Sequence, residues 1–151
     1  MTGTNFSSWY RQDEGTLYVE ASTFSTAGAP YYFAISDGTN ANTIIAYKAG
    51  STVYNDINAN NVLQFRETLG GNTSTTPIKL GSTYNFNNSA FSRDGSVSTT
   101  DTFCVIPIVN RLNIGVRGDA NQTTSLDGHI KRLTYFPQRL DNAELVEMTE
   151  Q

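Results

Sequence analysis

Short runs of alternating apolar and polar residues recur along the whole chain, and clusters of Gly, Asn, Asp or Pro separate them. In the run at 16–22, Leu17 and Val19 share one face of an extended segment, while Tyr18 and Glu20 share the other. This spacing of turn signals is typical of an all-β sandwich and predicts about eight to ten strands. The other runs lie at residues 31–36, 43–48, 62–68, 84–86, 90–92, 111–116 and 130–136.

Two interruptions in this pattern predict turns. Asp94-Gly95 has the composition of a two-residue hairpin, in which both central residues adopt positive φ. The stretch 87–89, Asn-Asn-Ser, separates the runs at 84–86 and 90–92. We expect a bulge or a sharp bend there.

One segment, after Pro137, carries the signals of a helix. Asp141 can act as the N-cap, and Glu144 follows at the capping-box spacing. Leu145 and Met148 fall on one face of that helix. We therefore expect a short C-terminal helix that packs onto the sandwich.

The composition fits one soluble domain over residues 1–151 and excludes several partners. The chain has 13 Ser, 20 Thr and 15 Asn but also 16 Tyr and Phe, so it is not disordered. The net charge is −4, and apart from Lys131-Arg132 the basic residues are scattered, which argues against nucleic acid as a partner. No 18-residue apolar run predicts membrane insertion, and the N-terminus lacks the features of a signal peptide. Cys104 lies in an apolar run and is expected to be buried.

The end of the chain, GHIKRLTYFPQRLDNAEL from Gly128 to Leu145, resembles the closing motif of concanavalin A-like, laminin G-like jelly rolls. Residues 7–20, with Ser-Ser-Trp-Tyr and then Glu-Gly-Thr-Leu-Tyr-Val-Glu, are similar to the first strand of such modules. Residues 33–38 and 111–115 are similar to further parts of them. The resemblance implies a jelly-roll β-sandwich of two antiparallel sheets with a short C-terminal helix, whose closing strand directs Ile130, Leu133 and Tyr135 into the core.

The residue sequence of this ending is most similar to that of modules in bacteriophage tail and virion proteins. The resemblance therefore implies a virion protein that acts extracellularly at the host surface. It also implies a parent tail protein, or a homo-oligomer, as a further partner. The loops at 58–61 and 72–77 depart from the family pattern, so the ligand is not carried over from it.

Relatives of this fold include glycosidases and lyases, which makes catalysis the first chemistry to consider. Retaining glycoside hydrolysis needs two carboxylates about 5–5.5 Å apart. Glu14 and Glu20 are six residues apart, and Asp13 and Glu14 are adjacent, so neither pair meets that need. His129, the one histidine, lies beside a core strand, where a structural role is expected. We predict that the domain is not an enzyme.

A structural calcium ion is the one cofactor that the sequence admits. Calcium takes oxygen ligands from loops. The loop at 37–42 supplies Asp37, Asn40 and Asn42, and the segment 119–127 is also rich in oxygen ligands. The same residues are ordinary turn formers, so the two interpretations stand side by side.

Sugar binding is the sharpest prediction, because neutral glycans are bound by aromatic rings together with amides and arginine. Each aromatic taken singly fits a core or cross-strand role, but eight Tyr are many for this length. If Phe33 and Ile35, and Leu63 and Phe65, face the core, then the intervening residues form an outer face. We predict a non-catalytic carbohydrate-binding module for polysaccharide; the alternative is a structural or oligomerisation module of a virion fibre. The candidate residues are Tyr18, Tyr32, Gln64 and Arg66 on the sheet face, with Trp9, Tyr47 and Tyr54 in loops as alternatives.

Overall fold

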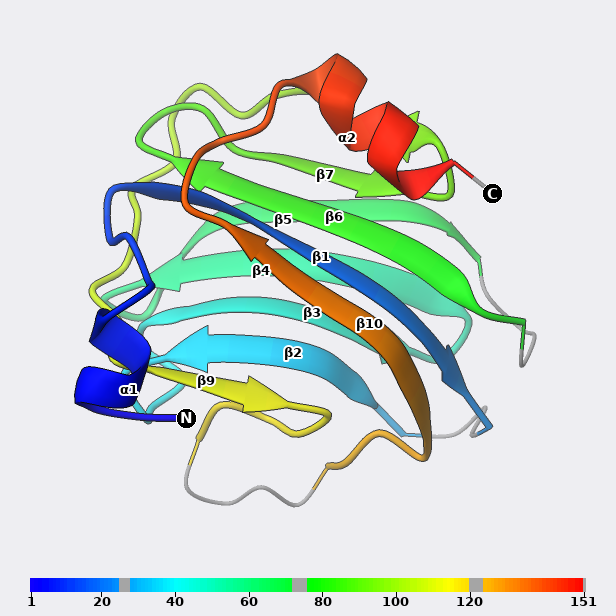
Figure 1. The fold of residues 1–151 in the computed structure, drawn as a ribbon, viewed down its shortest axis with the longest axis horizontal. Helices are drawn as coiled ribbons and strands as arrows, with labels where there is room; N and C mark the ends of the chain where they lie inside the picture. The colour runs from blue at the N-terminus through cyan, green and yellow to red at the C-terminus, as the bar shows by residue number, and fades with distance from the viewer. Residues whose placement is uncertain (25–27, 72–75, 120–123, 151) are drawn as a thin grey trace.

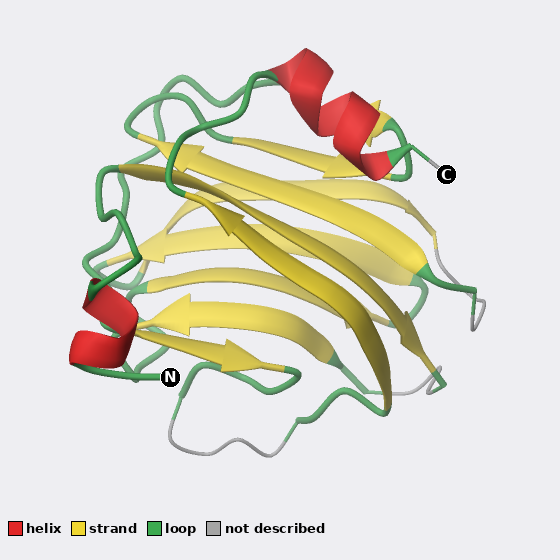
Figure 2. Cartoon of the chain, in the orientation of Figure 1, coloured by secondary structure: helices red, strands yellow, loops and turns green. Residues whose placement is uncertain are grey.

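Two antiparallel sheets lie face to face, with a short helix at each end of the chain (Figures 1 and 2). The computed structural model describes residues 1–24, 28–71, 76–119 and 124–150. The elements are α1 (Thr4–Ser7), β1 (Glu14–Thr23), β2 (Tyr31–Ser36), β3 (Thr43–Ala49), β4 (Thr52–Ala59), β5 (Val62–Gly71), β6 (Ile78–Asn85), β7 (Ala90–Arg93), β8 (Ser96–Val97), β9 (Arg111–Ile114), β10 (Gly128–Phe136) and α2 (Asn142–Thr149).

The front sheet in Figure 1 has the strand order β10-β1-β6-β7-β8, and the back sheet has the order β5-β4-β3-β2-β9. The first and last long strands, β1 and β10, are therefore neighbours in the front sheet. Both sheets are antiparallel throughout the described residues. This arrangement confirms the predicted all-β sandwich of two antiparallel sheets.

The hydrophobic core lies between the sheets and follows the predicted alternation on most strands. Leu17 and Val19 of β1, and Phe33 and Ile35 of β2, are almost wholly buried. Cys104 is buried with them, as expected. Leu63 is one exception, because 46% of its surface is exposed. It belongs to an edge strand, and the pairing of β4 with β5 shifts register beside it, between Ile57 and Asn58.

The predicted hairpin at Asp94-Gly95 is confirmed, since φ is 47° and 80° at these residues and they join β7 to β8. The interruption at 87–89 is a second turn, which joins β6 to β7. Asn87 has a φ of 54° there. The runs at 84–86 and 90–92 are thus the two arms of a hairpin.

Helix α2 covers the front sheet over β6 and β7 (Figure 1). Its capping box is complete, because Asp141 Oδ1 accepts from Glu144 N at 2.8 Å and Glu144 Oε2 accepts from Asp141 N at 2.7 Å. Gly81 makes room for the helix, since a Cβ there would lie 2.9 Å from Leu145 Cδ2. The predicted helix and its packing are confirmed.

The end of the chain closes the sandwich. Ile130, Leu133 and Tyr135 of β10 pack against the core, and the strand ends at Phe136, directly before Pro137. These are the positions that the resemblance implied. No helix in the described part of the chain has both the length and the apolar character to cross a membrane.

Candidate functional site

A row of three tyrosines crosses the outer face of the back sheet. The strand register places Tyr31 of β2 opposite Tyr47 of β3, and Tyr47 opposite Tyr54 of β4. The ring centroids are 5.3 Å apart in the first pair and 5.1 Å in the second, with interplanar angles of 18° and 13°. Ala46 and Val53, the neighbours in sequence, lie in the core, so the tyrosines face outward. We call this row the tyrosine ladder.

A buried carboxylate ties the ladder to an arginine. Arg66 of β5 pairs with Asp56 of β4, and its Nε and Nη2 donate to the two Asp56 oxygens at 2.8 and 2.6 Å. Tyr47 OH donates to the same carboxylate at 3.1 Å. The guanidinium also lies over the Tyr54 ring, 5.7 Å from its centroid. The Asp56 side chain is 4% exposed and that of Arg66 is 48% exposed, so the arginine presents a fixed, accessible donor.

The protonation states of this network follow from its burial and its charges. Burial, with the Asp56 charge beside it, raises the pKa of Tyr47 to about 12. The hydrogen bonds to Asp56 raise the pKa of Arg66 above its already high value. At neutral pH the Tyr47 hydroxyl is therefore a donor and Arg66 is charged.

The geometry of the ladder decides which surfaces a ligand can reach. The rings stand side by side and cover one another's faces, and Arg66 lies over Tyr54. The ladder thus offers ring edges, hydroxyl groups and a guanidinium. Such a surface can donate and accept hydrogen bonds along the sheet and can contact the C–H groups of a ligand at the ring edges.

Three of the predicted sugar-binding residues, Tyr47, Tyr54 and Arg66, meet at this site. Tyr47 and Tyr54 were predicted to lie in loops, but they lie in strands β3 and β4. Tyr31 and Asp56 complete the site and were missed. The signal for Asp56 was its place opposite Arg66, which becomes visible only once the β4–β5 pairing is known. Gln64 lies near the start of β5, where its Oε1 accepts from Val105 N at 3.4 Å.

The prediction that Tyr32 lies on the outer face is wrong. Its side chain is fully buried in the core. The pairing of β2 with β3 shifts register between Tyr31 and Phe33, so both Tyr32 and Phe33 contribute to the core. Tyr31 takes the outward position instead.

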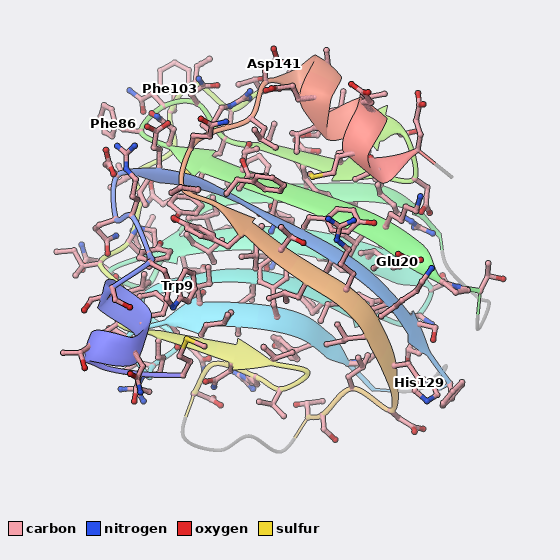
Figure 3. All side chains as sticks on the ribbon, in the orientation of Figure 1. Trp9, Glu20, Phe86, Phe103, His129 and Asp141 are labelled. Carbon is pink, nitrogen blue, oxygen red and sulfur yellow. The ribbon has the colours of Figure 1, made fainter. Side chains whose placement is uncertain are left out.

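The prediction of one open face that unites Tyr18, Tyr32, Gln64 and Arg66 is also wrong. Tyr18 faces outward, as predicted, but it lies on the front sheet and is 4% exposed beneath the Arg132 guanidinium. Trp9, labelled in Figure 3, packs against Phe6 and Tyr135, and its Nε1 donates to Asn5 O at 2.8 Å. Both residues are thus separate from the tyrosine ladder.

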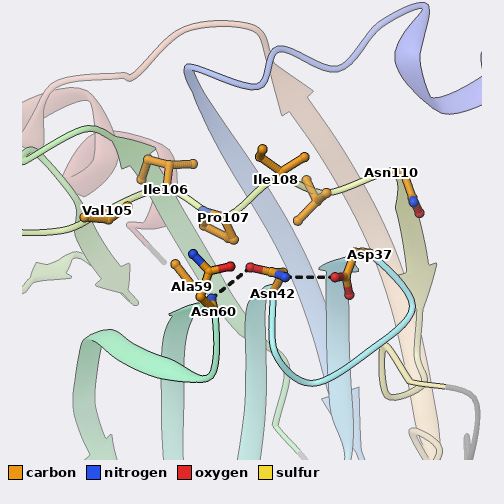
Figure 4. A pocket seen from close by; sticks show the side chains of 10 residues that line it. Asp37, Asn42, Ala59, Asn60, Val105, Ile106, Pro107, Ile108 and Asn110 are labelled. Carbon is orange, nitrogen blue, oxygen red and sulfur yellow. Dashed lines mark hydrogen bonds between the residues drawn. The ribbon is translucent and has the colours of Figure 1, made fainter.

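A pocket of about 460 Å³ opens at one end of the sandwich, between the loop at 37–42, the β4–β5 turn and the extended segment 103–110 (Figure 4). Asn42 lies at its centre. Its Nδ2 donates to Asp37 Oδ2 at 2.9 Å, and its Oδ1 accepts from Asn60 N at the same distance. The opposite wall is apolar, with Val105, Ile106 and Ile108. We call residues 103–110 the strap.

The three calcium candidates do not converge as a set. Asp37 and Asn42 bond to each other, whereas Asn40 Nδ2 donates to Asp119 Oδ2 at 3.0 Å. Asp37 Oδ1 also accepts from Thr39 N and Thr39 Oγ1. Burial works against ionisation of Asp37, but these hydrogen bonds outweigh it and lower its pKa. Part of the second candidate loop, 120–123, lies outside the described residues. In the described part of the chain no three His, Cys, Asp or Glu residues are grouped as metal ligands.

His129 lies near the start of β10, where its ring packs edge-on against Phe24 with centroids 5.0 Å apart (Figure 3). A ring that packs on an aromatic neighbour at a strand end fits the structural role expected of it.

No family model and no curated protein matches the sequence. Solved structures do match the fold. The CBM40 domain of the Ruminococcus gnavus IT-sialidase, in complex with α2,6-sialyllactose, superposes with a TM-score of 0.74 and 16% identity, over 91% of this chain and 84% of that one. A SAP-like pentraxin from Limulus polyphemus gives a TM-score of 0.65 and 14% identity, over 88% and 68%. Mouse laminin α1 domains LG4-5 give 0.64 and 12%, over 86% and 37%. These likenesses confirm the jelly-roll fold.

Proposed function

We propose that this domain is a non-catalytic carbohydrate-binding module and that the tyrosine ladder, with Asp56 and Arg66, is its binding surface. The observation that carries the proposal is the network in which Asp56 accepts hydrogen bonds from both Arg66 and Tyr47, beside three aligned tyrosines. A preformed row of donors, acceptors and ring edges suits a chain of hydroxyl-bearing rings.

Binding would proceed without large rearrangement, because the ladder lies on paired strands. Sugar hydroxyls would exchange hydrogen bonds with the tyrosine hydroxyls and the exposed amino groups of Arg66, while the C–H faces of the rings contact the tyrosine edges. Each contact is worth little on its own. The likeness to a CBM40 domain bound to sialyllactose supports a saccharide as the ligand class.

The place of action rests on the resemblance of the closing motif. The module would belong to a phage tail or virion protein and would bind host-surface or environmental polysaccharide outside the cell. Many copies on one particle would turn weak single sites into firm attachment. A structural calcium ion at the loop 37–42 is a further part of this proposal. Asn40 bonds to Asp119 and would have to turn toward Asp37 and Asn42 to complete the ligand set. Chelation of the wild-type protein before the binding assay tests it.

A specific observation favours the alternative of a structural or oligomerisation module. Large apolar side chains are exposed at the end of the sandwich that holds the strap: Phe86 is 62%, Phe103 85% and Ile108 79% exposed. Asn87 N donates to Cys104 O, which brings the segments of Phe86 and Phe103 together (Figure 3). An apolar surface of this kind is typical of protein contacts.

Affinity electrophoresis in a panel of polysaccharides tests the proposal. The double variant Tyr47→Ala/Tyr54→Ala should bind the retarding polysaccharide at least about tenfold more weakly, because it removes the ladder and one partner of Asp56. Phe86→Ala is the matched control, since it removes an exposed aromatic side chain elsewhere. If no polysaccharide retards the wild type, or if the double variant binds like the wild type, the ladder is not a sugar site and the structural alternative gains.

A further inference from the structure

The outer face of the front sheet carries a second pocket, of about 270 Å³, between β1, β10, β6 and the end of α2. Its lining includes Arg132, Lys79, Glu20, Tyr18 and Phe136. The inner faces of the two sheets pack on each other, so this pocket and the tyrosine ladder, which lie on the two outer faces, are on opposite sides of the molecule. We infer that this pocket binds an anionic group, a carboxylate or a sulfate, carried by a saccharide chain.

The strand register places the charges in one row. Glu20 of β1 lies opposite Arg132 on one side and Lys79 on the other. Because neighbouring strands are about 4.8 Å apart, the two cationic residues stand roughly 10 Å apart at their Cα atoms. Their long side chains flank the pocket from either side and can reach one ligand group between them.

Arg132 is held in a fixed orientation. Its guanidinium lies over the Tyr18 ring, 5.6 Å from the centroid, and its Nε donates to Thr134 Oγ1 at 3.2 Å. These contacts use the ring plane and the Nε of the guanidinium, and the two terminal amino groups are the atoms that anions commonly bind in a bidentate manner. Tyr18, predicted to contact sugar directly, acts here as the support for the arginine.

The acidic residue in the pocket is already neutralised. Lys131, which lies outside the lining, forms an ion pair through its Nζ with Glu20 Oε1 at 2.7 Å. Lys79 Nζ donates to the backbone carbonyl of Glu150 at 2.5 Å. Asp94, whose Oδ1 accepts from Lys79 N at 2.9 Å, also forms an ion pair with Arg93. Among the lining residues, Arg132 and Lys79 against Glu20 leave one positive charge, and Lys131 pairs with Glu20 from outside the pocket, on a chain whose net charge is −4. A local excess of positive charge on an acidic protein favours an anionic ligand at this place.

The other residues of the lining favour a sugar as the molecule that bears the anionic group. The pocket is about the size of one sugar ring, and Thr134 adds a hydroxyl while Phe136 and Met148 add apolar surface. A free inorganic ion would not use these groups. An acidic monosaccharide unit within a polymer would use both, with its charge between Arg132 and Lys79 and its C–H groups on Phe136.

The inference does not depend on the ladder and is tested separately from it. The probes are polygalacturonate, dextran sulfate and neutral dextran, in affinity electrophoresis at low salt and again at 0.5 M NaCl. The variants are Arg132→Gln/Lys79→Gln for the pocket, Tyr47→Ala/Tyr54→Ala for the ladder, and Arg11→Gln as a charge control. Arg11 is paired with Asp13 and Glu14 and is not one of the residues that line the pocket. Circular dichroism confirms that each variant is folded.

We expect at least one of the two polyanions to retard the wild type. Any retardation by neutral dextran should be the same in the wild type and in the Arg132→Gln/Lys79→Gln variant. The pocket variant should lose at least about tenfold in affinity for that polyanion, whereas the Arg11 and ladder variants keep it. The polymer that is retarded identifies the anion as carboxylate or sulfate. Salt at 0.5 M should weaken the binding, because exposed charges are screened. The inference is overturned if neither polyanion retards the wild type, or if the ladder variant loses polyanion binding and the pocket variant does not.

Discussion

Asp56 holds the polar groups of the back sheet in place, because it accepts hydrogen bonds from both Arg66 and Tyr47. The change Asp56→Asn keeps the size of the side chain and removes its charge. We expect a loss of about 1–2 kcal/mol in the free energy of unfolding, since a buried carboxylate is replaced while its half-exposed arginine partner is partly screened by water. Urea unfolding followed by circular dichroism measures it.

Asp13→Asn is the control for this prediction. Asp13 also pairs with an arginine, Arg11, but its side chain is 67% exposed. An exposed pair contributes little, so the expected loss is small beside that of Asp56→Asn. Equal losses for the two variants would show that the Asp56 network adds nothing beyond an ordinary surface pair. Polysaccharide binding should weaken in Asp56→Asn alone, because only that change frees Arg66 to move.

The sequence predicts only in part which side chains lie on the outer face of the back sheet. Alternation along β1 correctly separates the core face, with Leu17 and Val19, from the outer face, with Tyr18, because a regular strand has a side-chain period of two. The same rule fails at Tyr31 and Tyr32. An irregularity in the β2–β3 pairing places Tyr31 on the outer face and Tyr32 in the core. The sequence pattern of a single strand does not contain this information, because a bulge is a property of the pair of strands.

At the scale of elements, the capping box of α2 makes a direct prediction. Asp141→Ala removes the acceptor for Glu144 N and should cost about 1 kcal/mol of stability. The helix packs on Gly81 of β6 and through Thr149 on Ser92 of β7, so fraying of its first turn should leave the far end attached. Urea unfolding gives the change in stability. Glu147→Gln, on the same helix but outside the box, should shift the midpoint little, and an equal shift would argue against a role for the cap.

The ending of the chain was predictable and β4 was not, for a physical reason. Pro137, Asp141 and Glu144 act locally, and such signals determine where a strand stops and where a helix begins. Strand β4, from Thr52 to Ala59, contains three Asn or Asp residues, which are unfavourable in strands. Two of these, Asn55 and Asp56, are buried and find partners in the fold: Asn55 Nδ2 donates to Ile45 O, and Asp56 accepts from Arg66. Long-range hydrogen bonds override local propensity there.

At the scale of the whole molecule, the sandwich presents two faces of different chemistry. The back sheet carries the tyrosine ladder, and the front sheet carries the pocket with Arg132 and Lys79. If both bind saccharide, one domain can bridge two chains, and several domains on a particle would multiply the effect. The exposed apolar end near the strap lies on neither face, so attachment to a partner protein there would leave both faces accessible.

The tyrosines also determine how the whole fold responds to alkali. Burial raises the pKa of Tyr32 to about 12, and burial with the Asp56 charge does the same for Tyr47. In the unfolded chain both titrate near 10. Between pH 10 and 12 the unfolded state therefore binds fewer protons than the folded state, so the free energy of unfolding falls as the pH rises. The fall is roughly 1.4 kcal/mol per pH unit for Tyr32 and less for Tyr47, whose partly exposed site is screened by water. Below pH 10 this contribution is fully present.

Tyr32→Phe separates this effect from general alkaline damage. The Tyr32 hydroxyl is buried and makes no hydrogen bond to any residue that the structure describes, so its removal should leave stability at pH 7 unchanged or slightly higher. Between pH 10 and 12 the variant should lose stability less steeply than the wild type, by about one proton in the slope. Urea midpoints measured at pH 7, 10 and 11.5 give both values. An unaltered alkaline slope would contradict this prediction. It would mean that Tyr32 ionises equally in the folded and unfolded chains, although its side chain lies in the core.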